Sequence, residues 1–460
     1  MANRHRIRPG PPAAPRRGAA TLIVVMILFF IITLVAAYTS RNLLFEQRTS
    51  ANQFRSTLAF EAAEAGLEWA IARLNEGRMN DDCTELDPGT AVSAPPQPSF
   101  RERYLSINET SGAITAVPPT GGDTEIAAGC IFNGVGWSCH CPASGPPAPV
   151  VAAYVGNGPF PAFWVKFRHN LLGTPARPHI VRIQVNACTR AGANCLAFDR
   201  LAESGDGLAT VWAMVSLRSG LPSLPAAALT VRGTFSDGGE TATVTNEDAE
   251  STGITIHSGQ AFGIGSLQLN SIPGTPASLS VWRSDAALAF PDVVAPPVTT
   301  ADNGRNRMFN AFFGNWPATY TAQPGVVVVN CAADCTATEV NAAVARQPGQ
   351  PVYLSGGGRL TIGAAIGTAT DPVLIVTEGR VDFDAAVTVH GAIYSRAATW
   401  DLDGDGTIRG AAIAERNFTF EDNDLSIIYD RNVLLRLRNR TGSFAKVAGS
   451  WRDYQPGPNP

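Results

Sequence analysis

The strongest pattern along this 460-residue chain is one uninterrupted apolar segment near its beginning. Residues 19–40 carry no charge and consist mostly of Leu, Ile, Val, Phe and Ala. At about 1.5 Å per helical residue, such a segment crosses the roughly 30 Å hydrocarbon core of a bilayer. It is longer than the apolar stretch of a cleaved secretory signal, and no small-residue cleavage site ends it. It therefore predicts a transmembrane helix.

The helical pattern continues beyond the apolar segment. Residues 41–76 contain no Pro and many strong helix formers, with a single Gly at Gly66. Their apolar residues recur mainly every three or four positions, which places them in one stripe. We therefore predict one helix over residues 19–76, with a transmembrane half at 19–40 and a second half that packs on a globular domain. An ordinary single-pass anchor with a stalk would show the same periodicity.

Charge and cysteine placement predict the orientation of the chain. Five arginines and no acid precede the apolar segment, at positions 4, 6, 8, 16 and 17. By the positive-inside tendency, the N-terminus is cytoplasmic and the rest lies outside, in the periplasm if the membrane is a bacterial inner membrane. All eight cysteines follow the segment, as expected for disulfides in an oxidising compartment.

The cysteine spacing predicts only part of the disulfide pattern. The pairs Cys331 with Cys335 and Cys188 with Cys195 are spaced as local loops. The partners of the other four cysteines stay open; these lie at positions 83, 130, 139 and 141. A zinc site at residues 139–141 is the rival interpretation, but the chain lacks a second ligand pair at zinc-site spacing.

The composition favours a globular, turn-rich head without a nucleic-acid partner. Charged residues make up only 16%, and the chain contains 44 Gly and 33 Pro, which favours β structure with many turns. Without the five leading arginines, the formal net charge of −4 becomes about −9. Such a head lacks the basic excess of proteins that bind phosphate backbones.

Two regions follow the helix. Residues 77–224 predict a β-containing, disulfide-bearing region. Its strand-like runs are Val150–Val155, Phe163–Phe167, Ile180–Val185 and Ala209–Leu217. Residues 225–460 show short β-branched runs separated by Gly, Asn and Asp, which suggests a β-solenoid-like domain, with a β-sandwich or an irregular pair of sheets as the alternative. The aromatic piece at 281–319 predicts an insertion or a capping helix over an open end. The expected fold class is α+β, a long pilin-like transmembrane helix followed by a large β-rich head.

Particular residues near the N-terminus resemble a known family. The string Arg16-Arg17-Gly18-Ala19 resembles a prepilin leader, which implies a leader at 1–18 and cleavage by prepilin peptidase between Gly18 and Ala19. Residues 46–67, which include LAFEAAEAGL, resemble the N-terminal region of the PilX family of minor type IV pilins. The closing residues 449–454, GSWRDY, resemble the end of large PilX-like proteins.

One position departs from the major pilins that this family accompanies. Major pilins have Glu at the fifth mature residue, which neutralises the amino terminus of a neighbouring subunit, whereas this chain has Ile23. An unpaired ammonium buried in lipid or in a helical bundle is costly, so nothing readily docks above this subunit. In this respect it is similar to the K-type minor pseudopilin of type II secretion, which implies a tip or initiation role. Ala19 replaces the usual Phe at the first mature position.

One acidic loop suggests a metal. Asp401, Asp403 and Asp405 follow the D-x-D-x-D-G start of a calcium loop, in which alternate carboxylates converge on a hard cation. Position twelve is Ala412 rather than Glu, so a complete EF-hand is absent. Calcium is therefore a possible cofactor, and a plain acidic turn is the alternative.

The sequence thus predicts a non-enzymatic minor pilin-like subunit of type IV pilus assembly at the tip or initiation complex. The resemblance implies other minor pilins, the inner-membrane assembly platform, prepilin peptidase and a PilY-type tip adhesin as partners. It implies an inner-membrane location before assembly and a pilus-tip or cell-surface location afterwards. The alternative is a membrane-anchored adhesive or ligand-binding protein outside the filament. An enzyme of surface polysaccharides is disfavoured, because carboxylates two residues apart rarely flank a glycosidic bond.

Overall fold

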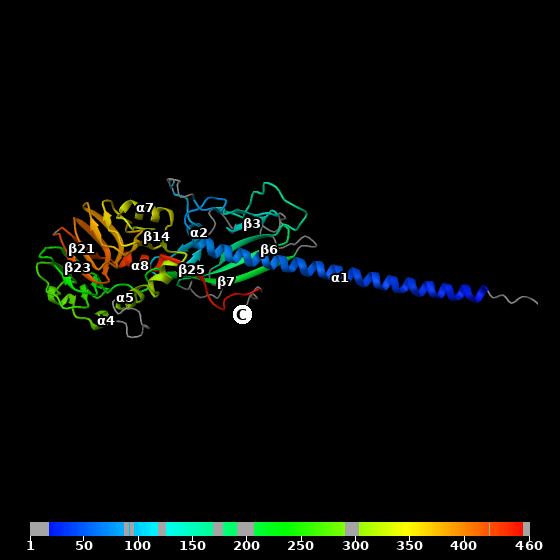
Figure 1. Cartoon of the computed structure of the whole chain (residues 1–460), viewed down its shortest axis with the longest axis horizontal. Helices are drawn as coiled ribbons and strands as arrows, with labels where there is room; N and C mark the ends of the chain where they lie inside the picture. Colours follow the sequence, from blue (N-terminus) through cyan, green and yellow to red (C-terminus); the bar gives the residue numbers. More distant parts are fainter. Residues whose placement is uncertain are drawn as a thin grey trace, which may run out of the picture. The chain divides into compact units, whose positions relative to one another are not determined.

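A computed structural model describes residues 18–86, 92, 96–117, 126–168, 178–190, 207–289, 303–422 and 424–453. The chain divides into two compact units, Met1–Thr57 and Leu58–Pro460. Helix α1 (Gly18–Leu74) continues from the first unit into the second without a break (Figure 1). The structure therefore contains the single long helix that the sequence predicts.

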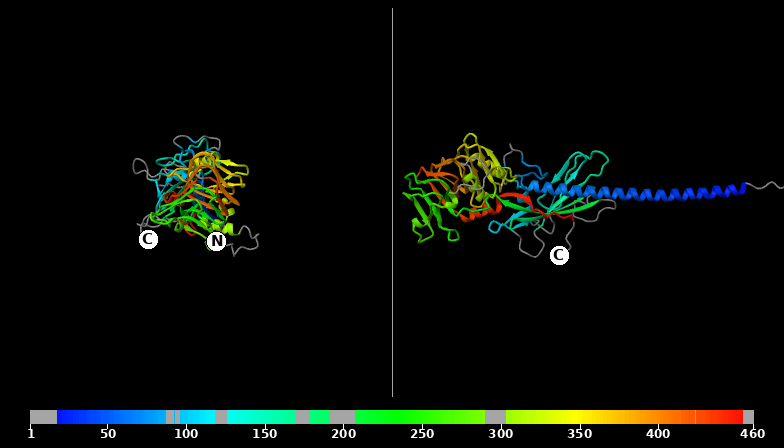
Figure 2. Two further views of the ribbon diagram at one scale, coloured as in Figure 1. Left: turned by 90° about the vertical axis from the view of Figure 1, so that its left-hand side faces the viewer. Right: turned by 60° about the horizontal axis from the view of Figure 1, so that its bottom comes forward.

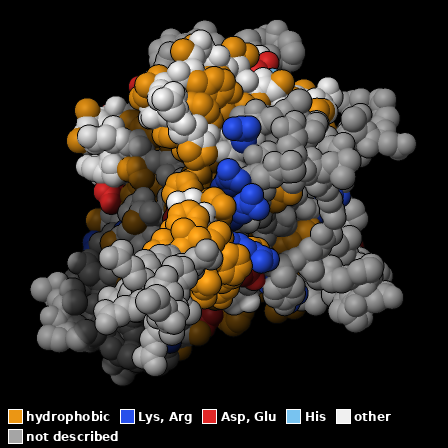
Figure 3. Space-filling view, turned by 90° about the vertical axis from the view of Figure 1, so that its right-hand side faces the viewer, with side chains coloured by type: hydrophobic (Ala, Val, Ile, Leu, Met, Phe, Trp, Pro, Cys, Tyr) orange, Lys and Arg blue, Asp and Glu red, His pale blue; other side chains and the backbone are white. Residues whose placement is uncertain are grey.

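Residues 20–40 of α1 are uncharged and mostly apolar around the whole circumference of the helix. Every large apolar side chain between Leu22 and Phe54 is more than half exposed. Among the described residues, α1 is long and apolar enough to cross a membrane. Figure 3 shows hydrophobic side chains gathered near the centre of the face that it draws, with several Lys or Arg side chains on one side of them. A helix that is apolar all round is stable only when lipid or protein surrounds it.

The second unit begins with an antiparallel sheet that covers one side of α1. Six strands lie in the order β25-β7-β6-β5-β3-β4. Their bounds are β3 Ala128–Phe132, β4 Trp137–His140, β5 Ala162–Arg168, β6 Ile180–Cys188, β7 Leu208–Ser219 and β25 Gly442–Lys446. Before them come α2 (Phe100–Tyr104) and the two-stranded sheet of β1 (Leu105–Ile107) and β2 (Ile114–Ala116). We call residues 58–219 and 442–453 the helix–sheet module.

Small residues let α1 approach this sheet closely. Ala63, Leu67 and Ala70 are fully or almost fully buried against the apolar face of the sheet. A Cβ atom at Gly66 would lie 2.7 Å from the ring of Phe163, a distance that side chains do not tolerate. Glycine is therefore required here by packing, although it lowers helix propensity.

The rest of the second unit is a stack of parallel strands, which we call the parallel stack (residues 220–441). Its main sheet runs in the order β12-β10-β24-β22-β20-β18-β16-β14, with β8, β11 and β13 branching from β22. The bounds are β8 Ala227–Val231, β10 Thr243–Asn246, β11 Ile254–Ser258, β12 Gln268–Ser271, β13 Val281–Trp282, β14 Val327–Asn330, β16 Val352–Ser355, β18 Val373–Thr377, β20 Val387–Ser395, β22 Gly406–Ala414 and β24 Ser426–Tyr429.

Two smaller parallel sheets accompany the main one. Their orders are β15-β17-β19 and β21-β23-β9. The bounds are β9 Phe235–Ser236, β15 Cys335–Thr336, β17 Leu360–Ile362, β19 Val381–Phe383, β21 Thr399–Leu402 and β23 Asn417–Phe420. The sheets enclose one apolar core. The described α and β elements are those of the predicted α+β class, a long apolar helix followed by a β-rich head.

Apolar side chains stack from strand to strand through this core. One ladder of cross-strand partners is Val352, Ile375, Ile393, Ala412, Leu229, Ile256 and Val281. All but the last are fully buried, so each strand adds an apolar residue to its neighbour. The stack does not follow chain order throughout, because β8 to β13 lie beyond β22 although they precede it in sequence.

Helices cover the stack and join it to the helix–sheet module. The bounds are α4 Ala286–Ala289, α5 Asn303–Phe313, α6 Pro317–Thr321, α7 Ala337–Arg346 and α8 Arg431–Arg440, with a short 3-10 turn at Ala277–Leu279. Phe309 and Phe313 of α5 pack on Tyr394, which lies on one face of the main sheet. The predicted capping helix thus covers a sheet face, and its aromatic residues belong to the core. Figure 2 shows the same elements from two further directions.

Two details differ from the sequence expectations. Residues 150–155 form no strand and most of them are exposed. Strand β25 pairs with β7 of the helix–sheet module although it lies within 225–460, because the chain returns after α8 to complete the antiparallel sheet. The predicted strand runs at 163–167, 180–185 and 209–217 correspond to β5, β6 and β7.

Candidate functional site

The predicted pilus-assembly residues lie at the start of α1. Gly18 and Ala19 are its first two residues, and residues 1–17 of the predicted leader lie outside the described part of the chain. Ile23 is 57% exposed and has apolar neighbours on both sides. The structure places these residues on one helix, and cleavage after Gly18 stays a prediction.

The three aspartates of the predicted calcium loop do not form one group of neighbouring ligands in the structure. Asp401 lies in β21, whereas Asp403 and Asp405 lie in the turn before β22. Ligand atoms of Asp405, Asp422 and Asp424 lie within 4.8 Å of one another. Asp401 and Asp403 do not belong to that group. Asp422 and Asp424 were not among the residues predicted from the sequence, although three acidic residues at 421, 422 and 424 were a visible signal.

Asp401 and Asp403 instead lie near Glu421. Burial raises the pKa of the Glu421 carboxyl, and the negative charges of Asp401 and Asp403 raise it further. Phe383 donates its backbone N–H to the carbonyl of Asp403 at 2.9 Å, so the loop is held to the next strand of the stack. The acidic residues therefore come from β21, from the turn before β22 and from the residue that follows β23, and they do not form one converging loop.

Every cysteine in the described part of the chain is disulfide-bonded. Cys331 pairs with Cys335 as expected, and the four open cysteines pair as Cys83 with Cys141 and Cys130 with Cys139. These bonds occupy the thiols that a zinc site at 139–141 would need. Cys188 is disulfide-bonded, and its predicted partner Cys195 lies outside the described residues.

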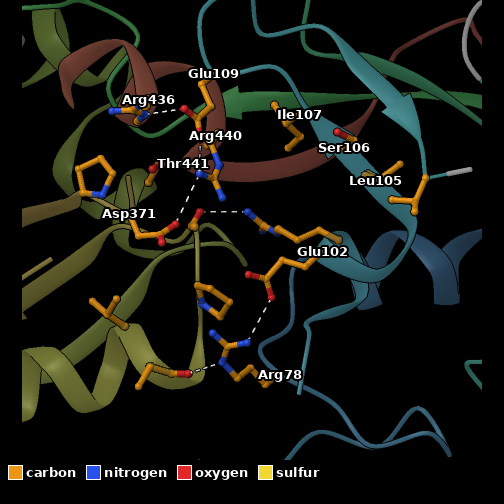
Figure 4. A pocket seen from close by; sticks show the side chains of 17 residues that line it. Arg78, Glu102, Leu105, Ser106, Ile107, Glu109, Asp371, Arg436, Arg440 and Thr441 are labelled. Carbon is orange, nitrogen blue, oxygen red and sulfur yellow. Dashed lines mark hydrogen bonds and ion pairs between the residues drawn. The ribbon is translucent and has the colours of Figure 1, made fainter. Parts of the chain in front are cut away.

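A pocket of about 650 Å³ lies where the helix–sheet module meets the parallel stack (Figure 4). Its lining comes from β1 and its flanks, from the end of α7, and from α8. The lining includes four arginines and three carboxylates: Arg78, Arg101, Arg436, Arg440, Glu102, Glu109 and Asp371. These residues are far apart in sequence, so the pocket exists only because the two modules meet.

Glu109 closes one end of the pocket by binding two arginines of α8. Its carboxylate accepts from Arg436 at 2.6 Å and from Arg440 at 2.9 Å. The hydrogen bond from Arg436 is the main reason that the pKa of Glu109 lies below its usual value. Asn439 adds a hydrogen bond of 2.7 Å to the backbone carbonyl of Glu109. We call these contacts the Glu109 clasp, and they fasten α8 to the loop after β1.

The other end of the pocket is held by Arg78 and Arg101. Arg78 donates to the carbonyl of Ala345 at 2.6 Å and forms an ion pair with Glu102. Arg101 is 4% exposed and donates to the carbonyls of Leu74, Gly349 and Gly442 at 3.0 to 3.1 Å. Burial lowers the pKa of Arg101 to about 10, so it remains charged at neutral pH.

Comparison with protein families identifies the N-terminal region. Residues 17–68 match the family model described as PilX N-terminal. This segment is therefore similar to the N-terminal region of PilX proteins. No curated protein matches the chain.

Among solved structures, the competence-associated pilin ComZ from Thermus thermophilus is similar at 12% identity, over 87% of this chain and 97% of that chain. The TM-score is 0.20, so this alignment supports no conclusion about the head.

The PilX segment and the other candidate sites occupy different parts of the chain. Gly18, Ala19 and Ile23 lie within residues 17–68. The pocket and the acidic group at Asp405 lie outside that match. The similarity to PilX proteins therefore concerns the N-terminal helix alone, and any role of the head must be argued from its own residues.

We predict that Glu109→Gln loosens the junction between the modules. The folded-state pKa of Glu109 is lowered, so its contribution is present above its unfolded pKa near 4.3 and is lost as pH falls through the folded value. The variant should lose about 1 kcal/mol of the free energy that holds α8 to the helix–sheet module. Because a Gln side chain does not ionise, the variant should also lack the part of the weakening at low pH that protonation of Glu109 causes. Hydrogen exchange of residues 431–440 measures the effect.

Asp371→Asn is the matched control. Asp371 contacts Arg440 at 3.5 Å but is 73% exposed, so its loss should change exchange little. Equal protection of α8 in wild type and Glu109→Gln at pH 7 would contradict the clasp.

Proposed function

We propose that this protein is a minor pilin-like subunit of a type IV pilus-related assembly, with a structural rather than an enzymatic role. The observation that carries the proposal is the PilX match over residues 17–68, since residues 18–68 lie in one uninterrupted helix that exposes an apolar surface. In this proposal the N-terminus is cytoplasmic and the head is periplasmic before assembly. The partners are prepilin peptidase, the inner-membrane assembly platform and other minor pilins.

Burial of the exposed apolar surface of α1 supplies the driving force for insertion into the membrane and for assembly into a filament. Fully burying one large apolar side chain contributes about 1.5–3 kcal/mol relative to water. The first unit exposes such side chains from Leu22 to Phe54, so it must lie in lipid or among other helices. Transfer from lipid to a filament then replaces lipid contacts with contacts to neighbouring helices, as in other membrane helix bundles.

Ile23 supports a place at the tip or in the initiation complex. An isoleucine offers no charge to the amino terminus of a subunit above it, so adding that subunit would bury an unpaired ammonium. A head of about 400 residues at the end of a filament would meet no neighbour above it. A PilY-type adhesin is the partner that the family resemblance suggests for that place.

The parallel stack supports a β-solenoid-like architecture for the distal head. Parallel strands repeat along one main and two smaller sheets, and apolar ladders fill the interior. The break in chain order at β8 distinguishes it from a simple solenoid. Calcium at Asp405, Asp422 and Asp424 is a further proposal, since alternate carboxylates in a turn are ligands that calcium accepts.

We predict that the mature protein begins at Ala19 in cells with prepilin peptidase and retains residues 1–18 in cells without it. The peptidase recognises the basic leader that ends at Gly18. Intact mass measurement of protein from membranes tests this. Gly18→Lys should block cleavage in cells that have the peptidase. Retention of the leader in both strains would favour the anchored adhesive protein outside a filament.

We predict that Ile23→Glu increases the number of copies per filament several-fold. The new carboxylate can accept the ammonium of the next subunit, so the protein no longer ends the filament. Quantitative mass spectrometry of sheared pili measures copy number. Ile27→Glu, one helical turn further on, adds the same charge at the wrong height and should not increase it. An unchanged copy number in Ile23→Glu would argue against the tip role.

We predict that calcium at about 1 mM raises the unfolding temperature of the wild type through Asp405, in the affinity range of extracellular calcium modules. Asp405→Asn should abolish the shift because it removes one of three converging ligands. Asp401→Asn should keep it, since Asp401 lies outside that group. Absence of any calcium effect on the wild type would leave only an acidic turn.

A further inference from the structure

The strand that lines the pocket has a free edge. β1 and β2 pair as Leu105 with Ala116, Ser106 with Thr115 and Ile107 with Ile114. Val117 donates its N–H to Tyr104, and Asn108 donates to Ala113, just outside the strands. Because bonded and non-bonded pairs alternate in an antiparallel ladder, Leu105 and Ile107 occupy non-bonded positions. Their backbone N–H and C=O groups therefore point away from β2.

Three of these groups have no hydrogen-bond partner in the described part of the chain. The N–H of Leu105 is used, since it donates to the carbonyl of Arg101. The carbonyl of Leu105 and both polar groups of Ile107 remain. An added strand uses such groups, and edges of this kind are usually covered or blocked.

The free edge faces a groove with an opposite wall. Leu105, Ser106 and Ile107 line the pocket on one side. Val344, Ala345 and Pro348, from the end of α7 and the residues after it, line it as well. The Glu109 clasp and the contacts of Arg78 hold the two sides together at separate points, as Figure 4 shows. A volume of about 650 Å³ admits a short chain segment rather than a domain.

The charges of the pocket favour an acidic occupant. Glu109 and Asp371 are paired with Arg436 and Arg440, and Glu102 is paired with Arg78. The fourth arginine, Arg101, uses three of its five N–H donors on carbonyl oxygens and forms no direct ion pair among the described residues, although the charge of Glu102 acts on it. With four arginines against three carboxylates, the lining carries one net positive charge, which attracts a further carboxylate.

We propose that the edge of β1 is a docking site for an extended, carboxylate-bearing segment of another pilus subunit, which adds to β1 as a strand. The free groups of Leu105 and Ile107 bind its backbone, the α7 side contacts its side chains, and Arg101 attracts its acid. The inference rests on the proposed function, since it takes the partner from the same assembly.

The test places a photo-crosslinking benzophenone residue at Ser106 in the full chain, in pilus-producing cells. Ser106 is exposed and lies at the centre of β1. We expect an adduct to an extended, acidic segment of another pilus subunit, mapped by mass spectrometry. The same label at Ser144, an exposed serine outside the pocket lining, is the control and should not give this adduct.

Two variants separate docking from nearby collision. Ile107→Pro removes the outward N–H and keeps the bonds between β1 and β2, because position 107 is not bonded to β2. Ala345→Trp fills the groove from the opposite wall and leaves β1 unchanged. Each should reduce the adduct at least tenfold. Ala345→Trp keeps the test decisive if the proline variant fails to fold.

The outcomes distinguish a failure of the docking site from a failure of the proposed function. No adduct at Ser106, the same adduct in both variants, or an adduct to a helical surface, to a segment without acid or to a protein outside the pilus would overturn the docking site. The N-terminal mass is measured in the same cells. A mature chain that begins at Ala19 and enters filaments without the adduct means that the docking proposal fails while the proposed function stands. An uncleaved chain outside filaments means that both fail.

Discussion

The close packing of α1 on the antiparallel sheet is the contact on which the head depends. At Gly66 the helix backbone meets the ring of Phe163, and alanines on either side keep the approach close. The first part of the same helix is exposed and apolar, whereas its last part is buried against the sheet. A residue with any side chain at Gly66 would separate helix and sheet, and the core beneath them would lose contacts.

The end of that helix also organises the junction with the parallel stack. Asn75, just beyond α1, donates to the carbonyl of Phe444 at 2.9 Å and accepts from its N–H at 2.7 Å. Its side chain thus covers the outer edge of β25 much as a neighbouring strand would. Gln350 of the parallel stack donates to the backbone carbonyl of Asn75 at 2.8 Å, and Arg101 binds carbonyls from α1, β25 and the turn at Gly349.

The parallel stack is held together differently, by repetition rather than by one central contact. Its ladders join neighbouring strands in register, and the fully buried Trp400 donates its ring N–H to the carbonyl of Val381 at 2.8 Å. Aromatic residues of α5 close the opposite face of the main sheet. The returning chain ties this stack to the helix–sheet module, because α8 leads directly into β25.

The sequence by itself determined the elements whose cause is local. Periodicity and the absence of Pro are sufficient for α1, alternating apolar runs for β5 to β7, and short spacing for the disulfide of Cys331 and Cys335. The PilX-like residues lie together in one segment, so they too were visible in the sequence. Only the tertiary structure decided three features: the proximity of Asp405 to Asp422 and Asp424, the pairing of β25 with β7, and the pocket between the modules. These depend on contacts between residues that are distant in sequence, and a one-dimensional pattern carries no information on which distant segments meet.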